Sequence, residues 1–196
     1  MSDPVVTEKC GLRARMRQLR RDHVAAQPDS IRALLFKRPP VPVAAMVGEG
    51  ATVGLYSALG AEAPADSYAR WFAEHGHAIA LPWFAGRDAD MAFRRWTDPF
   101  AGDDLVDGPF GLRQPAAAAG LVTPDVLIVP LLAFTAGCDR LGQGAGHYDH
   151  WIEAHPGVTT IGLAWDCQLV EGLPVEPHDR PLDTVVTPTR LYRRAA

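Results

Sequence analysis

Three glycines alternate with other residues from Gly142 to Gly146, shortly after an apolar run, Val126 to Val129, that is typical of a buried strand. Alternating glycines let the backbone turn its N–H groups toward one point, which suits phosphate oxygens. A helix that begins behind such a loop adds partial positive charge at its N-terminus. The loop is therefore either a phosphate-binding loop or a tight turn without a ligand, and glycine spacing alone does not separate the two.

Neither of two common phosphate motifs describes this loop. A P-loop requires G-x-x-x-x-G-K-[ST], but Gln143 and Gly144 stand where its lysine and hydroxyl residue would be. A Rossmann fingerprint requires G-x-G-x-x-G in a tight strand-to-helix turn, whereas here a long segment, 131–141, separates the strand from a G-x-G-x-G run. Asp166 ends the next β-rich run, where a ribose-binding acid would stand, and keeps a dinucleotide interpretation open as a minor alternative.

Imidazole and carboxylate side chains follow the glycines. His147 and His150 could share one helix face, but no third nitrogen or sulfur ligand stands nearby, which disfavours zinc. Asp149 is either an ordinary acid in the first turn of a helix or a Mg²⁺ ligand, since Mg²⁺ takes one or two carboxylates together with phosphate oxygens. Asp179 is open to the same choice, with a turn residue between prolines as its simpler interpretation.

A basic segment near the N-terminus could face an anion. Its apolar spacing predicts a helix from about Thr7 to Ala26. Lys9, Arg13 and Arg17 stand four residues apart and so share one face of that helix. Because six basic residues and no acidic one lie between positions 9 and 21, this face is either solvated or lies over an anionic ligand.

The elements that would position these groups alternate between strands and helices. This order predicts an α/β fold, with a mostly parallel, Rossmann-like sheet flanked by helices and a ligand site at the carboxyl ends of the strands. Helices are expected at 30–36 with Ser30 as cap, at 66–75 with Asp66 as cap and Gly76 as stop, and at 148–155. Strands are expected at 51–56, 78–81 (closed by Pro82), 91–96, 125–129, 158–165 and 184–186, and residues 116–119 form a short helix or a linker.

Length and composition bound the possibilities further. The 196 residues suit one domain, 1–196, and 47% apolar with 21% charged residues is ordinary for a soluble protein. A net charge of -4 argues against nucleic acid as a partner. Cys10, Cys138 and Cys167 are too few and too scattered for a disulfide framework. No apolar run has membrane-spanning length and no secretory signal is evident, so no membrane partner and a cytoplasmic location are expected.

The segment Arg140-Leu141-Gly142-x-Gly144-x-Gly146-x-Tyr148-Asp149 resembles the signature of the 5-formyltetrahydrofolate cyclo-ligase family. Most of the chain shares the resemblance in collinear order. The further blocks are Lys9-x-x-x-Arg13, Tyr56 through Glu62, Leu81-Pro82, Met91-x-Phe93, Phe110-Gly111-Leu112-x-x-Pro115, Ile161-Gly162-Leu163-Ala164, Gln168-Leu169-Val170, Leu173-Pro174 and His178-Asp179-x-Pro181-Leu182-Asp183.

The resemblance implies an ATP- and Mg²⁺-dependent monomeric enzyme that closes 5-formyltetrahydrofolate to 5,10-methenyltetrahydrofolate and releases ADP and phosphate. It implies catalytic roles for Arg140, His147 and Tyr148, and Mg²⁺ binding by Asp149 and Asp179. The implied ATP contacts, with the N-terminal helix packed over them, are Lys9, Arg13, Arg140, Leu141, Gly142, Gln143, Gly144, Ala145, Gly146, His147 and Tyr148. The implied folate contacts are Tyr56, Glu62, Gln143, Gly144 and His147.

Three positions depart from the family pattern. Many members carry a basic residue at the position of Ala145, a tyrosine at that of His147 and an aspartate at that of Thr135. A lost cation beside a transferred phosphate can matter by orders of magnitude in rate. Two alternatives therefore stay open: a nucleotide- or folate-binding module that has lost catalysis, and an ATP-dependent enzyme for another N-formyl or amide substrate. If Asp149 binds Mg²⁺, Asp149→Asn should lower turnover steeply with the melting temperature nearly unchanged.

Overall fold

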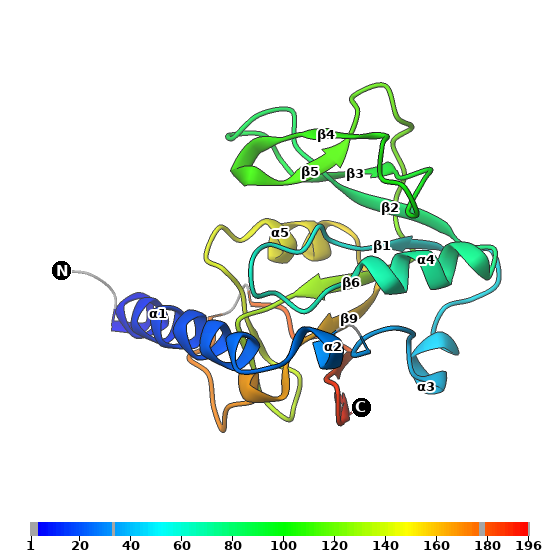
Figure 1. Cartoon of the computed structure of the whole chain (residues 1–196). Coiled ribbons are helices and arrows are strands. Elements are labelled where there is room, and N and C mark those ends of the chain that lie inside the picture. Colours follow the sequence, from blue (N-terminus) through cyan, green and yellow to red (C-terminus); the bar gives the residue numbers. More distant parts are fainter. Residues whose placement is uncertain (1–3, 33, 177–178, 196) are drawn as a thin grey trace.

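The computed structural model describes residues 4–32, 34–176 and 179–195. Its centre is a seven-stranded sheet of order β11-β10-β9-β6-β1-β2-β3 (Figure 1). The inner strands are parallel, and the edge strands β3 and β11 run antiparallel to their neighbours, which confirms the mostly parallel α/β fold. The strands are β1 (Thr52–Gly54), β2 (Ala78–Trp83), β3 (Ala92–Arg95), β6 (Val126–Pro130), β9 (Thr159–Leu163), β10 (Thr184–Val186) and β11 (Leu191–Arg193).

Helices and two small hairpins surround this sheet. The helices are α1 (Pro4–Ala25), α2 (Asp29–Arg32), α3 (Val41–Ala44), α4 (Asp66–Glu74) and α5 (His147–Ala154), with 3-10 turns η1 (Pro109–Gly111) and η2 (Asp166–Gln168). One hairpin pairs β4 (Leu105–Asp107) with β5 (Arg113–Pro115), and the other pairs β7 (Ala133–Phe134) with β8 (Arg140–Leu141).

Strand β6 is apolar on both of its faces because helices cover the sheet on both sides. Val126 and Ile128 belong to the core cluster that contains Phe72 of α4, whereas Leu127 belongs to the cluster that contains Trp151 of α5. Such two-sided burial is characteristic of parallel sheets, whose strands therefore lack a polar alternation. The covering helices leave the carboxyl ends of β1, β2 and β6 for the loops that form the site.

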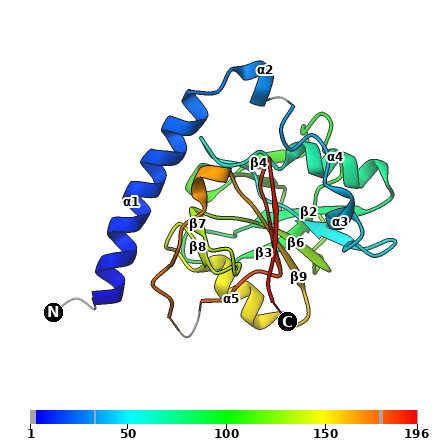
Figure 2. The ribbon, with the colours of Figure 1, turned by 90° about the horizontal axis from the view of Figure 1, so that it is seen from below.

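Helix α1 lies along one side of the molecule, apart from the helices that cover the sheet (Figure 2). It occupies Pro4–Ala25, close to the predicted range. Its apolar anchor is Met16, which is buried and packs with Leu132 and Leu141 of the segment that leads to the glycine loop. Leu12 adds to this cluster and Val24 packs against the main core, and polar contacts from the basic face of the helix complete its attachment.

One strand prediction was wrong in detail, and one edge strand was not predicted. The second strand does not end at Pro82 but continues to Trp83. Strand β1 ends at Gly54, opposite Ala80, so Pro82 has no partner on that side whose hydrogen bond it could break. The structure also adds the edge strand β11, which pairs with β10 and was not predicted.

Two helix predictions were also wrong in detail. Asp66 is the first residue of α4 rather than its cap, and the cap residue Ala65 makes no side-chain cap hydrogen bond; Gly76, at φ 85°, follows the helix as expected. The short helix α2 spans Asp29–Arg32, so Ser30 lies inside it and is not its cap. The helix does not reach Phe36, whose φ of 55° is a left-handed conformation that a helix cannot contain. Residues 116–119 contain a turn, so of the two predicted alternatives the linker is confirmed.

Among the residues that the structure describes, no helix combines the length and the apolar character that crossing a membrane requires.

Candidate functional site

A cavity of about 440 Å³ opens where β1, β2 and β6 end. Residues that follow or close these strands line it, among them Tyr56, Phe84 and Pro130. All the site residues named from the sequence line this one cavity: Lys9, Arg13, Tyr56, Glu62, Arg140, Leu141, Gly142, Gln143, Gly144, Ala145, Gly146, His147, Tyr148, Asp149 and Asp179. The fold thus brings together segments that lie up to 170 positions apart in the chain.

The glycine loop connects β8 to α5. Gly144 has φ 116° and Gly146, the N-cap of α5, has φ 73°, so both need the left-handed conformation that glycine adopts without strain. The β7–β8 hairpin precedes the loop and fills the long segment between β6 and the glycines. The loop with the N-terminus of α5 therefore presents backbone N–H groups and partial positive charge beside the cavity.

A Gly144→Ala variant should be less stable and bind nucleotide more weakly. A side chain here would be strained at φ 116° and would stand 3.4 Å from the Arg13 guanidinium. We expect the free energy of unfolding to fall by about 1–2 kcal/mol, and ATP affinity to fall because Arg13 is displaced. Urea denaturation and ATP titration measure both. Gly137→Ala is the matched control, because its Cβ would have ordinary contacts outside the cavity; equal effects in the two variants would contradict the prediction.

Helix α1 reaches the cavity through its basic face. Lys9 is 3% exposed, and its Nζ lies 2.6 Å from Oε2 of Glu176 and 2.5 Å from Oδ2 of Asp179. Burial lowers the pKa of Lys9, but the hydrogen bonds and charges of Asp179 and Glu176 more than offset this and raise it overall. Arg13 donates from Nε to the carbonyl of Gly142 at 3.1 Å. Of the three basic residues on this face, Lys9 and Arg13 line the cavity.

Arg140 and Asp149 form a partly buried ion pair across the glycine loop. Nη2 of Arg140 donates to Oδ1 of Asp149 at 2.6 Å, and the Arg140 side chain is only 3% exposed. The backbone N–H of Arg180 lies 3.5 Å from the same Oδ1. Within the described part of the chain, Oδ2 of Asp149 has no partner. The pair therefore offers the cavity a cation and one carboxylate oxygen.

The carboxylates of the cavity suit a cation that also binds a ligand. No group of three or more His, Cys, Asp or Glu residues in the described ranges is arranged to hold a metal ion. Asp149 and Asp179 line the same cavity, each in contact with a basic side chain. Mg²⁺ commonly uses one or two carboxylates, with water and substrate phosphates as its other ligands. The donor set therefore fits Mg²⁺ delivered with a polyphosphate.

An aromatic wall faces the glycine loop. Phe84 and Phe110 pack edge-on, and the His147 ring lies 4.9 Å from the ring of Phe84 and 5.5 Å from that of Phe110. Burial, followed by the neighbouring His150, lowers the pKa of His147, which keeps its imidazole neutral near pH 7. Phe110 itself is held at φ 63° before Gly111, an arrangement that costs strain for a bulky residue.

Sequence reasoning assigned His147 to the site but not Phe84, Phe110 or Glu176. Met91 and Leu112 also line the cavity. Two of the family blocks, Met91-x-Phe93 and Phe110-Gly111-Leu112, were the signal that could have identified these apolar residues as part of the site. Glu176 stands three positions before Asp179 and shares Lys9 with it. His178, in the same family block as Asp179, lies outside the described residues.

Two tyrosines and Glu62 also line the cavity. The hydroxyl of Tyr56 donates to the carbonyl of Ala63, and burial, then the charge of Glu62, raises the pKa of Tyr56 well above its ordinary value. The same two causes raise the pKa of Tyr148. Both phenols are therefore neutral at physiological pH and can donate or accept hydrogen bonds. Thr135, in contrast, lies outside the lining and hydrogen-bonds with Asp139 at the turn of the β7–β8 hairpin.

Comparison with known proteins gives one consistent family. The model of the 5-formyltetrahydrofolate cyclo-ligase family matches residues 5–188. The chain is 32% identical to the 5-formyltetrahydrofolate cyclo-ligase of Mycolicibacterium smegmatis over 178 residues, which cover 81% of this chain and 91% of that protein. It is 50% identical to the Escherichia coli K12 protein of the same name over 95 residues, which cover 45% of this chain and 52% of that relative. The E. coli match therefore spans only about half of its relative's length.

Solved structures agree in fold. The NMR structure of the 5,10-methenyltetrahydrofolate synthetase of Aquifex aeolicus matches with a TM-score of 0.74 at 24% identity, covering 94% of this chain and 92% of that one. The synthetase of Mycoplasma pneumoniae matches with a TM-score of 0.65 at 19% identity, covering 91% and 97%. With the family model matched along almost the whole length, the chain belongs to the 5-formyltetrahydrofolate cyclo-ligase family.

Proposed function

We propose that this protein catalyses the ATP- and Mg²⁺-dependent cyclisation of 5-formyltetrahydrofolate to 5,10-methenyltetrahydrofolate, with release of ADP and phosphate. The observation that carries the proposal is that the residues implied to bind nucleotide, folate and metal all line the same cavity. Family membership supplies the reaction class. A glycine loop of the kind that binds phosphate lies beside an aromatic wall, which suits a polyphosphate bound next to a flat, largely apolar ligand.

The reaction needs the formyl oxygen to become a leaving group. That oxygen attacks the γ-phosphorus of ATP, the bond to the bridging oxygen breaks, and ADP leaves. The N10 amine then attacks the activated formyl carbon and loses its proton. Departure of phosphate, driven by the lone pair of N5, completes the methenyl bridge. Because no enzyme nucleophile takes part, the protein contributes mainly positioning and charge stabilisation.

The residues around the cavity match these needs. In this proposal the glycine loop, Arg13 and Lys9 bind the phosphates, and Arg140 meets the charge on the transferred group. Glu62 and Tyr56 contact the folate, and neutral His147 lies against the aromatic wall, where it can pack beside a ring or hydrogen-bond to it. Asp149 and Asp179 would hold Mg²⁺, which when bound would neutralise phosphate charge and orient the polyphosphate.

The decisive experiment follows the methenyl chromophore as 5-formyltetrahydrofolate is mixed with enzyme, ATP and Mg²⁺. We expect absorbance to grow only when all three components are present. Binding of ATP without any product would show a module that has lost catalysis. ATP hydrolysis with another N-formyl compound, but poor turnover of the folate, would show a different substrate. Either result would overturn the proposal.

The three cysteines should be dispensable, because the proposed reaction uses no thiol. Cys10 is exposed, whereas Cys138 is buried and burial raises its pKa. Burial also raises the pKa of Cys167 to about 11, so little thiolate is present at pH 8. Iodoacetamide at pH 8 should therefore label Cys10 first, as peptide mass spectrometry would show, and leave cyclisation unchanged. Rapid labelling of Cys167, or loss of activity on modification of Cys10, would contradict this.

A further inference from the structure

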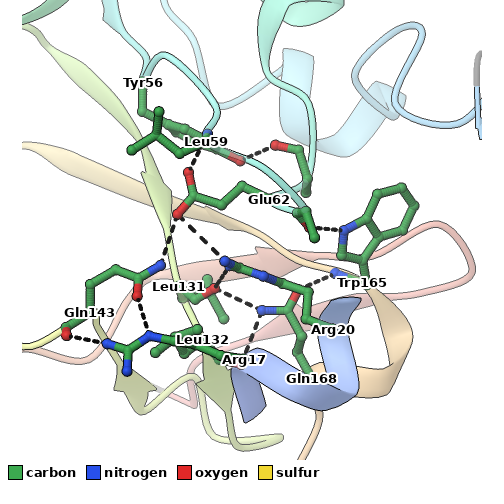
Figure 3. A network of polar contacts seen from close by, with 12 residues as sticks. Arg17, Arg20, Tyr56, Leu59, Glu62, Leu131, Leu132, Gln143, Trp165 and Gln168 are labelled. Atoms are coloured by element: carbon green, nitrogen blue, oxygen red, sulfur yellow. Dashed lines mark hydrogen bonds and ion pairs between the residues drawn. The ribbon is translucent and has the colours of Figure 1, made fainter. Parts of the chain in front are cut away.

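The carboxylate of Glu62 is held by three separate parts of the chain (Figure 3). Its Oε2 accepts from the backbone N–H of Leu59 at 2.9 Å, within the loop that follows β1. Its Oε1 accepts from Nε2 of Gln143 in the glycine loop at 3.0 Å and lies 3.8 Å from Nη1 of Arg20 in α1. The Glu62 side chain is only 8% exposed, so its charge depends on these partners.

Arg20 is an unusual residue for its position. Its side chain is 8% exposed, its Nη1 donates to the carbonyl of Leu131 at 3.3 Å, and burial lowers its pKa. Its Nε is buried without a partner among the described residues. Gln168 donates to the same Leu131 carbonyl at 2.7 Å, so that carbonyl does not depend on Arg20. A buried, incompletely satisfied cation contributes little to stability, and its clearest counter-charge is Glu62.

Arg17 fixes the second contact to Glu62 from the same helix. It donates from Nε to Oε1 of Gln143 at 3.1 Å and from Nη2 to the carbonyl of Gln143 at 2.9 Å. With its amide oxygen facing a cation, Gln143 must turn its NH₂ group toward the carboxylate. Figure 3 shows the resulting contacts, which run from Arg17 through Gln143 to Glu62 and from Glu62 to Arg20.

Hydrogen bonds also hold the loop that carries Glu62 in place. Nε1 of Trp165 donates to the carbonyl of Ala61 at 3.0 Å, and the Tyr56 hydroxyl donates to that of Ala63. The backbone on both sides of Glu62 is thus fixed, and only the side-chain torsions remain to be set. The N–H of Leu59 fixes Oε2, and the contacts of Arg20 and Gln143 fix Oε1.

We propose that Arg20 is a positioning residue that holds the Glu62 carboxylate for the formamide substrate, assisted by Arg17 through Gln143. The inference rests on the proposed function, in which Glu62 contacts the folate. A carboxylate that is already ordered loses less conformational entropy when it binds a ligand, so the set of contacts should govern substrate affinity. It should leave phosphoryl transfer, which takes place around Arg140 and the glycine loop, largely unchanged.

The first test compares Arg20→Met and Arg20→Lys with the parent enzyme. We expect Arg20→Met to raise the KM for 5-formyltetrahydrofolate about tenfold, with kcat and the KM for ATP changed less than about twofold, and Arg20→Lys to recover part of the loss. Arg21→Met is the matched control, since Arg21 is an exposed residue of the same helix whose side chain contacts Gln18. A fall in kcat at constant folate KM would overturn the proposal.

A double-mutant cycle separates positioning from general loss of structure. If Arg20 acts through the carboxylate, Arg20→Met should have almost no effect on folate KM in a Glu62→Gln background. The same tenfold effect in both backgrounds would overturn the proposal. If Arg20→Met does not fold, Arg20→Lys and Arg17→Met enter the same cycle, because Arg17→Met removes the contacts that orient the Gln143 amide toward Glu62 and leaves Arg20 in place.

Equilibrium titration with 5-formyltetrahydrofolate, without ATP, distinguishes failure of this inference from failure of the proposed function. An inactive parent protein would overturn the proposed cyclisation, and about tenfold weaker folate binding by Arg20→Met would still support the positioning role. An active parent protein with unchanged folate binding by Arg20→Met would overturn the positioning role alone. A parent protein that neither turns over nor binds the folate would overturn both.

Discussion

Replacing Arg140 by methionine is expected to lower the rate of ring closure by about a thousandfold. Arg140 precedes the glycine loop, is almost fully buried and lines the cavity. A guanidinium in a site of low dielectric stabilises charge on a transferring phosphoryl group far more than it would in water, and methionine retains only the packing. The methenyl absorbance at saturating ATP, Mg²⁺ and folate measures the loss in kcat directly.

Arg140→Lys should fall between the parent and the methionine variant, because lysine keeps the charge and loses the planar fork of donors. Arg95→Met serves as control for an arginine removed from the exposed edge strand β3. Circular dichroism and urea denaturation would show that each variant is folded before its rate is compared. A kcat within tenfold of the parent value for Arg140→Met would contradict the role assigned to Arg140.

The cations of the cavity come from distant segments, which bears on the missing lysine at Ala145. Lys9, Arg13, Arg113 and Arg140 line the cavity with four carboxylates, those of Glu62, Asp149, Glu176 and Asp179. In the proposed function, the basic groups of α1 and β8 would supply the positive charge that the loop lacks at Ala145. Lys9 and Arg140 already form ion pairs with carboxylates. When a polyphosphate and Mg²⁺ bind, these ion pairs would be replaced: Mg²⁺ would bind the carboxylates, and the phosphates would bind the basic side chains.

The parts of the site that sequence reasoning identified are those with local signals. The glycines of the loop stand where φ must be positive, at Gly144 and Gly146, and the apolar run before them is buried on both faces. The parallel sheet was predicted because apolar runs of this kind alternate with helices along the chain. The edge strand β11 and the strands of the β4–β5 hairpin lack this signal, because a strand of three residues is too short to show apolar periodicity.

Other parts depend on contacts between distant residues. Arg20 continues a basic helix face in the sequence, and only packing against Leu131, 111 positions away, shows that it is buried beside Glu62. The aromatic wall joins Phe84 and Phe110 from loops without periodicity to His147 of α5. Thr135, a departure from the family pattern, lies at a hairpin turn instead of the cavity, which removes one of the reasons to suspect a module without activity.

Asp149→Asn is expected to lower kcat about a hundredfold and to raise the Mg²⁺ concentration needed for half-maximal activity. Asparagine keeps an acceptor for Arg140 but loses the charge that the cation and the guanidinium both need. The sequence alone suggested unchanged stability; the ion pair with buried Arg140 instead predicts a fall of about 1–3 kcal/mol in the free energy of unfolding, as the arginine loses its counter-charge.

Magnesium titrations at several ATP concentrations distinguish two roles for Asp149. Glu153→Gln is the matched control, because Glu153 lies on the same helix and forms an exposed ion pair with Arg180; it should change neither the Mg²⁺ requirement nor kcat. Asp149→Asn could raise the KM for ATP while the half-maximal Mg²⁺ concentration stays at the parent value. In that case Asp149 acts only by holding Arg140, and Asp179 and the substrate would have to hold the metal. A shift in the Mg²⁺ requirement that persists at saturating ATP cannot arise from Arg140 and would identify Asp149 as a metal ligand.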